Sequence, residues 1–181
     1  MNRKRFFEET VSSSMLFKGE VVGIRKDIIK SRRGQFSQEI VEHPGAVAIV
    51  PIIGENMVMV KQLRYSSKKI MLELPAGTLE KDENPDECAR RELIEETGYI
   101  ASSLKKMLQF YVAPGYDTEI VHIYLATNLI KNEQKLDKYE DIDVLKISVN
   151  DILLMIKKNE IDDAKSIAGI LYYQTFINSL V

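Results

Sequence analysis

The segment GTLEKDENPDECARRELIEETGY, residues 77–99, concentrates acidic side chains between two glycines. Its 23 residues include eight Asp or Glu, and like charges placed this close together repel one another. Two explanations compete. The segment is either the solvated face of a surface helix, which is the usual place for charged residues, or a set of oxygen ligands for a multivalent cation.

The same segment carries signals for the start and the end of a helix. Asn84 is a good N-cap, Pro85 suits the first helical position, and Glu87 falls where a capping box places its acidic residue. Gly98 suits the position just after a helix. The pattern predicts a helix that begins at Pro85 and ends before Gly98.

On such a helix three glutamates share one face. Glu92, Glu95 and Glu96 fall within an arc of about 100°, because 3.6 residues complete a turn. Leu93 lies on the adjoining arc and can pack inward, so the glutamates border an apolar patch where unneutralised charge is costly. Carboxylate oxygens without a His or Cys partner favour Mg²⁺ or Mn²⁺ over zinc. Arg91 can reach Glu95 one turn away and orient it.

The composition of the whole chain limits the class of protein. Its 181 residues fit one domain with a modest extension, and 45% hydrophobic and 29% charged residues are ordinary for a soluble protein. A net charge of −2 argues against a nucleic-acid partner bound through a basic surface. Cys88 is the single cysteine, so an intrachain disulfide is excluded. No apolar run is long enough for a signal peptide or a membrane span. We expect a cytoplasmic protein without a membrane partner.

Strand patterns surround the acidic helix on both sides. The turn at Pro44-Gly45 is the best candidate boundary, and it divides an N-terminal β extension, residues 1–43, from a main domain, residues 44–181. Because strands interleave with helices without a repeated βαβ unit, we expect a mixed sheet packed between helices. Strands are expected at 20–29, 36–42, 46–53, 56–63, 70–77, 108–113, 120–127 and 142–148, and further helices at 149–159 and 163–179.

The acidic segment resembles the Nudix hydrolase signature, G-x5-E-x7-R-E-U-x-E-E-x-G-U, where U is aliphatic or aromatic. At ordinary residue frequencies of roughly 7%, a complete match by chance is improbable. The resemblance implies a Mg²⁺-binding loop–helix–loop motif, with Mn²⁺ as a substitute, that hydrolyses a nucleoside diphosphate linked to another group. It also implies an α/β (α+β) fold, an α/β/α sandwich with a mixed β-sheet, plus an N-terminal antiparallel β extension. The constrained positions are filled by Gly77, Glu83, Arg91, Glu92, Leu93, Glu95, Glu96, Gly98 and Tyr99.

By position, the resemblance implies roles for the residues of the signature. Glu92, Glu95 and Glu96 would hold the metal together with the backbone carbonyl of Ala76. Arg91 would shape the loop with Glu83, and Arg91 and Glu95 would count among the catalytic residues. The resemblance therefore favours the second explanation, in which a bound metal neutralises the negative charge of the segment.

Residues outside the signature resemble the ADP-ribose pyrophosphatase branch of the family. The likeness lies in LELPAG at 72–77, in APGYDTE, where Pro114 follows Tyr99 by fifteen residues, and in EHPGAVAIVPI, KQLRY and YEDIDVLKIS. This branch cleaves ADP-ribose to AMP and ribose 5-phosphate. Three alternatives stay open: the same chemistry on a nucleotide sugar, NADH or a dinucleoside polyphosphate, a nucleotide-binding module without turnover, and a structural calcium site.

The branch also implies substrate-binding residues. Arg64 would grip a phosphate, since its planar guanidinium can bind bidentately, although a solvated arginine at a strand end fits equally well. Pro114, Gly115 and Glu119 would contact the substrate, and for Glu119 a solvated glutamate at the start of a strand is the alternative.

The resemblance to this branch also implies a general base on the polar loop before the last strand. Glu140 aligns with that region, and a carboxylate on a mobile loop can deprotonate the attacking water. Asp141 is the neighbouring rival, and a plain solvated loop is the alternative to both. The N-terminal strands resemble those that pair in homodimers of this branch and form one side of an adenosine pocket.

Overall fold

The computed structural model describes residues 8–178 of the chain. These residues form two compact units. The first unit contains residues 8–45 and 111–120, and the second contains residues 46–110 and 121–178.

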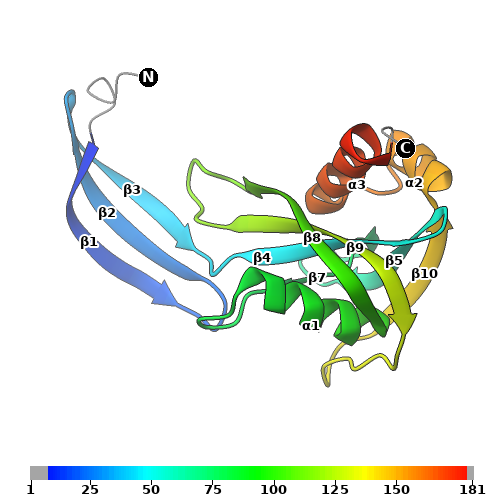
Figure 1. Ribbon diagram of the computed structural model, residues 1–181. Coiled ribbons are helices and arrows are strands. Elements are labelled where there is room, and N and C mark those ends of the chain that lie inside the picture. The colour runs from blue at the N-terminus through cyan, green and yellow to red at the C-terminus, as the bar shows by residue number, and fades with distance from the viewer. Residues whose placement is uncertain (1–7, 179–181) are drawn as a thin grey trace. The chain divides into compact units, whose positions relative to one another are not determined.

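The first unit is built on a three-stranded antiparallel sheet in the order β1-β2-β3 (Figure 1). Its strands are β1 (Glu8–Lys18), β2 (Gly23–Ser31) and β3 (Gly34–Glu42). β1 was not expected, and β2 begins three residues later than the strand predicted from residue 20. Large apolar side chains on this sheet are exposed: Val11, Met15, Phe17, Ile24 and Phe36.

Residues 111–120 join the first unit through backbone hydrogen bonds. The N–H of Val41 donates to the carbonyl of Tyr116 over 2.8 Å, and the N–H of Thr118 donates to the carbonyl of Val41 over 3.0 Å. Val41 also forms a parallel β-bridge with Asp117. The turn between two later strands is therefore anchored to β3.

The second unit contains a seven-stranded mixed sheet, which confirms the predicted sheet type. Its main order is β10-β5-β4-β9-β8, with β6 paired to β5 and β7 paired to β4. β4 and β9 are parallel, whereas β4 and β5, and β5 and β10, are antiparallel. The strands are β4 (Ala46–Ile53), β5 (Asn56–Arg64), β6 (Lys69–Glu73), β7 (Ala76–Thr78), β8 (Tyr99–Tyr111), β9 (Ile120–Lys131) and β10 (Ile142–Ser148).

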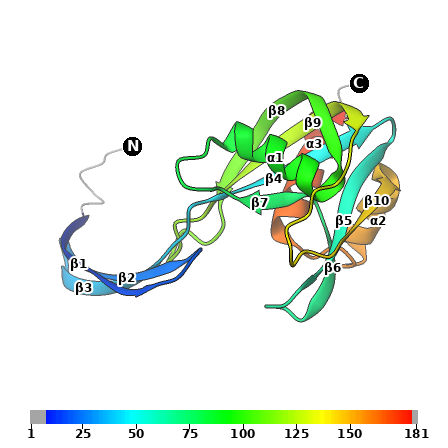
Figure 2. The same cartoon turned by 90° about the horizontal axis from the view of Figure 1, so that it is seen from below.

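Helices cover both faces of this sheet. Figures 1 and 2 show α1 (Pro85–Thr97) on one face, and α2 (Val149–Lys157) and α3 (Ala164–Phe176) on the other. The predicted three-layer α/β/α arrangement is confirmed for this unit. Within residues 8–178, no helix has the length and apolar character that a membrane crossing requires.

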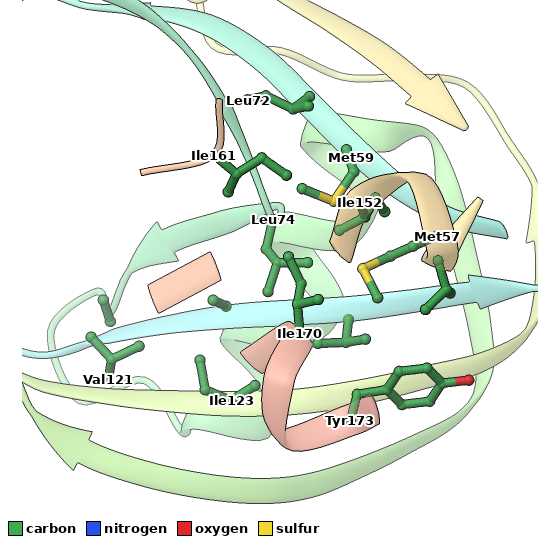
Figure 3. Close-up of a cluster of buried hydrophobic side chains, with 14 residues drawn as sticks. Met57, Met59, Leu72, Leu74, Val121, Ile123, Ile152, Ile161, Ile170 and Tyr173 are labelled. Atoms are coloured by element: carbon green, nitrogen blue, oxygen red, sulfur yellow. The ribbon is translucent and has the colours of Figure 1, made fainter. Parts of the chain in front are cut away.

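Alternate residues of β4 supply the two cores, as the two-residue period of a strand requires. Ala48 and Val50 enter the cluster beneath α2 and α3. Figure 3 shows this cluster with Met57, Ile152 and Ile170 labelled. Val47 and Ile49 enter the cluster beneath α1. Burying one such aliphatic side chain contributes about 1.5–3 kcal/mol. The large side chains of the first cluster that are fully buried are Met57, Met59, Leu74, Ile123, Ile152, Ile161 and Ile170.

The predicted ends of α1 are confirmed. The Oδ1 atom of Asn84 accepts a hydrogen bond from the N–H of Asp86 over 2.9 Å, which is the contact of an N-cap. Gly98 has a left-handed φ of 64°, and its N–H donates to the carbonyl of Ile94. A residue with a side chain would be strained there, so the glycine ends the helix.

Several strand boundaries differ from the prediction. The strand expected over 70–77 is divided into β6 and β7, because Pro75 lacks the N–H that a continuous ladder uses. β8 and β9 are longer than the segments expected at 108–113 and 120–127. The last helix was expected to reach residue 179, which lies outside the described residues, and α3 ends at Phe176.

Candidate active site

β7 and α1 meet where the first glycine of the acidic segment lies. β7 pairs with β4, and this places Gly77 opposite Val47. A Cβ atom on Gly77 would lie 1.8 Å from Oε1 of Glu92, a distance that no two unbonded atoms can adopt. The absence of a side chain at Gly77 therefore lets the carboxylate of Glu92 approach the backbone of β7.

Arg91 gathers three carboxylates around one guanidinium. It donates to Glu83 from Nε over 2.8 Å and from Nη2 over 3.0 Å. Its Nη1 donates to Glu92 over 2.7 Å and to Glu95 over 2.9 Å. The hydrogen bond from Arg91 is the main reason that the pKa of Glu83 falls to about 2. The structure thus brings together four of the signature residues predicted from the sequence.

Glu92 and Glu96 are buried carboxylates on the inner side of α1. Their exposed fractions are 9% and 3%. Burial raises the pKa of Glu92 to about 7 and that of Glu96 to about 8, and the charge of Glu140 adds to both shifts. Oε2 of Glu96 accepts a hydrogen bond from the N–H of Ala76 over 2.9 Å. Two neighbouring acids thus face a strong penalty for ionising together.

The donor chemistry of these residues fits a hard divalent cation. A cation beside Glu92 and Glu96 would favour the charged form of both, and carboxylate and carbonyl oxygens are the ligands that Mg²⁺ prefers. As the side chains lie, Glu92 and Glu95 bond to Arg91, and Glu96 bonds to the N–H of Ala76. Among residues 8–178, no three acidic, His or Cys side chains therefore converge as a ready metal site.

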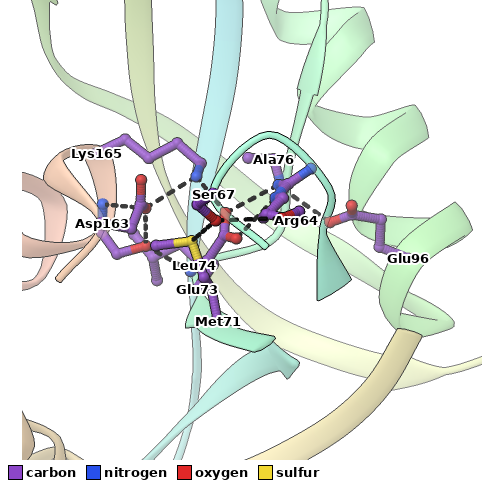
Figure 4. A network of polar contacts seen from close by, with 10 residues as sticks. Arg64, Ser67, Met71, Glu73, Leu74, Ala76, Glu96, Asp163 and Lys165 are labelled. Atoms are coloured by element: carbon purple, nitrogen blue, oxygen red, sulfur yellow. Dashed lines mark hydrogen bonds and ion pairs between the residues drawn. The ribbon is translucent and has the colours of Figure 1, made fainter. Parts of the chain in front are cut away.

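Arg64 ends β5 and is bound to an acid that the sequence did not single out. Its Nε and Nη2 atoms donate to the two carboxylate oxygens of Glu73 over 2.7 and 2.9 Å (Figure 4). Burial alone would raise the pKa of Glu73, but bonds to Arg64 and Lys165 outweigh burial and hold the pKa below its usual value. Sequence reasoning missed Glu73, although it lies within the LELPAG segment.

A pocket of about 510 Å³ brings Arg64 together with the two candidate bases. Glu140 and Asp141 both line it. Oε2 of Glu140 accepts a hydrogen bond from the N–H of Asp137 over 3.0 Å, which fixes the carboxylate within its own turn. The remaining lining residues are Lys61, Gln62, Leu63, Ile70, Tyr139 and Asp143.

The other predicted substrate-binding residues lie in the first unit. The carbonyl of Gly115 accepts a hydrogen bond from Nε2 of Gln38 over 2.8 Å. Oε1 of Glu119 lies 3.9 Å from Nδ1 of His43, which is beyond hydrogen-bond distance, and this Nδ1 accepts a hydrogen bond from the N–H of Gly45 over 3.1 Å. Pro114 precedes Gly115 in the same turn between β8 and β9.

Comparisons with known proteins identify related sequences. The NUDIX domain family matches residues 42–169. The ADP-ribose pyrophosphatase of Bacillus subtilis (strain 168) is 39% identical over 175 residues, covering 94% of this chain and 95% of that protein. The methanol dehydrogenase activator of Bacillus methanolicus is 41% identical over the same length, with the same coverage.

A solved structure supports the fold independently. The crystal structure of an ADP compounds hydrolase superposes with a TM-score of 0.84 and 17% sequence identity, covering 96% of this chain and 95% of the other. At that identity the likeness concerns the fold. The family match, the two full-length relatives and the complete signature around Gly77 and Glu92 lead to one conclusion: the chain belongs to the Nudix family.

Proposed function

We propose that the protein is a Mg²⁺-dependent pyrophosphatase that hydrolyses ADP-ribose to AMP and ribose 5-phosphate. The observation that carries this proposal is the match to an ADP-ribose pyrophosphatase over nearly the full length of both chains. The complete carboxylate set on α1 supports turnover rather than binding alone, because a module that only binds nucleotide has no use for it.

Four ligand groups would hold the metal: the carboxylates of Glu92, Glu95 and Glu96 and the carbonyl of Ala76. When bound, Mg²⁺, or Mn²⁺ in its place, neutralises the diphosphate oxygens and makes a water molecule a better nucleophile. Arg91 keeps the carboxylates at the glycine turn, because it bonds to Glu83, Glu92 and Glu95 at once.

Two of the remaining roles fall to residues that line the pocket. Glu140 would accept the proton of the attacking water, since it lines the pocket and its charge acts on Glu92 and Glu96. Arg64, which lines the pocket, would bind a substrate phosphate through donors that Glu73 does not use. Pro114, Gly115 and Glu119 would contact the substrate from the turn between β8 and β9.

We further propose a cytoplasmic homodimer in which residues 1–43 are the dimerisation extension and residues 44–181 are the Nudix domain. The exposed apolar side chains of the β1–β3 sheet support this, because apolar patches of that kind mark interaction surfaces. Light scattering should give the mass of a dimer. Phe17→Glu, which places a charge on the sheet, should shift the mass towards a monomer.

The activity is tested by product analysis with Mg²⁺ and a panel of ADP-ribose, NADH, nucleotide sugars and dinucleoside polyphosphates. Glu96→Gln should lower turnover at least 100-fold, whereas Glu87→Gln, an exposed glutamate on the same helix, should leave it unchanged. Faster turnover of another substrate would overturn the choice of ADP-ribose but keep the Nudix chemistry. Tight nucleotide binding without any hydrolysis would overturn the enzyme assignment.

A further inference from the structure

Glu73 is a buried carboxylate shared by two cations from different elements. Its exposed fraction is 1%. Oε1 accepts from Nε of Arg64 over 2.7 Å, and Oε2 accepts both from Nη2 of Arg64 over 2.9 Å and from Nζ of Lys165. Figure 4 shows Glu73 between the arginine of β5 and the lysine of α3. One negative charge therefore faces two positive charges.

The first turn of α3 holds the lysine in place. Oδ2 of Asp163, the N-cap of α3, accepts from Nζ of Lys165 over 2.9 Å and from the N–H and hydroxyl groups of Ser166 over 3.0 and 2.6 Å. Ser166 in turn accepts from the N–H of Leu74 over 2.8 Å. The residue that follows Glu73 is thus tied to the same helix turn that carries Lys165.

This arrangement has a consequence for the charge of Arg64. The start of α3 and the donors of Ser166 already stabilise the charge of Asp163. Lys165, although it also donates to Asp163, can then compensate part of the charge of Glu73, so Glu73 can orient the Arg64 guanidinium without cancelling all of its charge. A fixed, incompletely neutralised guanidinium at the edge of a pocket is suited to a phosphate.

We propose that Lys165 is a positioning residue that acts on Arg64 through Glu73 and so sets the affinity of the pocket for the phosphate of the substrate. The proposal rests on the proposed function in one respect, namely that Arg64 binds phosphate. Lys165 does not line the pocket, so its effect passes through the shared carboxylate.

The kinetic test compares Lys165→Met with Lys165→Arg and with a matched control. In Lys165→Met, Arg64 is the one remaining cation of the pair that bonds to the Glu73 carboxylate. We therefore expect KM for ADP-ribose to rise about 5- to 10-fold while kcat changes less than 2-fold. This is the pattern expected when binding of substrate and transition state weakens equally. Lys165→Arg, which keeps the charge, should restore most of the KM. The control is Lys69→Met, because Lys69 makes an ion pair with Asp162 beside the same helix without touching Glu73. Its KM should match the wild type.

A second measurement reports on Arg64 without catalysis. The Nε–H group of Arg64, assigned through Arg64→Lys, should exchange slowly with solvent in ¹H–¹⁵N spectra, because it donates to a buried carboxylate. Lys165→Met should shift this signal.

The outcomes separate this proposal from the proposed function. A wild-type KM in Lys165→Met with only a lower Tm would overturn it, and so would an equal rise in KM in the Lys69→Met control. If wild-type protein does not hydrolyse ADP-ribose, the proposed function fails. The positioning of Arg64 is then decided by its Nε–H signal, and an unchanged signal in Lys165→Met would overturn it.

Discussion

The Glu92 carboxylate occupies the space that a side chain on Gly77 would fill, since a Cβ there would lie 1.8 Å from its Oε1 atom. Gly77→Ala should therefore push the carboxylate away from β7. We expect kcat for ADP-ribose to fall at least 100-fold, because Glu92 is a proposed metal ligand and a small misplacement of such a group is costly to catalysis. Steady-state kinetics and the Tm measure the two effects. A kcat within threefold of the wild type would show that the close approach of Glu92 is not needed.

Protonation of two buried acids links stability to pH in the metal-free protein. The pKa values of Glu92 and Glu96 are about 7 and 8, against 4.5 for an ordinary glutamate. Between pH 4.5 and about 8, Glu92 and Glu96 bind more protons in the folded protein than in the unfolded chain. Their contribution to the free energy of unfolding therefore decreases as pH rises. The stabilisation is complete below pH 4.5 and is lost as pH passes through 7 and 8.

We therefore expect the Tm in EDTA to fall by about 5 °C or more between pH 5 and pH 9. Glu96→Gln should flatten this profile, because the amide does not titrate. Thermal melts across the range provide the check. Glu83 does not interfere, since its pKa is about 2 and its contribution is lost only in acid. A Tm that rises steadily with pH would contradict the assignment of the two raised pKa values.

The two candidate bases can be told apart by matched amides. The charge of Glu140 acts on both buried acids of α1. Glu140→Gln should lower kcat about 100-fold or more with little change in KM, within the usual contribution of a general base. Asp141→Asn should lower it less than threefold. The reverse result in steady-state kinetics would move the role of base to Asp141.

The N-cap of α1 offers a test of stability apart from catalysis. Asn84→Ala removes the acceptor of the Asp86 N–H, and loss of such a cap costs about 1 kcal/mol. The Tm should drop by about 2–4 °C for a protein of this size. Because Asn84 lies at the end of α1 away from Glu92 and Glu96, kcat at low temperature should stay unchanged. A large loss of kcat would mean that the cap also positions the glutamates.

Local signals were sufficient for α1 and for the carboxylates of the site. The N-cap at Asn84, the end at Gly98 and the shared face of Glu92 and Glu96 all follow from residues close together in the sequence. β1 could not be predicted from periodicity, because all of its residues are exposed and no buried face imposes alternation. Its Ser12–Ser14 run also lacks the branched residues typical of strands.

The polar network around Arg64 could not be predicted from the sequence. Glu73 lies in a strand with several apolar residues, and no sequence pattern there indicates which cations it bonds to. Lys165 lies far from both Arg64 and Glu73 along the chain. Their meeting depends on the packing of α3 against the sheet, which only the tertiary structure provides. The sequence suggested for Arg64 either a phosphate ligand or a solvated side chain, and it gave no sign of the buried acid that holds the guanidinium at the pocket.

The parallel pairing of β4 with β9 also bears on the order in which the protein is assembled. Ala46 pairs with Val121, and the whole of α1 is synthesised between them. β9 supplies Tyr124 and Ala126 to the cluster beneath α1, so the helix lacks part of its support until that strand leaves the ribosome. Contacts between distant parts of a chain form slowly. A nascent chain that stops before Ile120 would already carry every glutamate of the signature, but those acids would remain hydrated and titrate normally, and affinity for metal would appear only when the sheet closes.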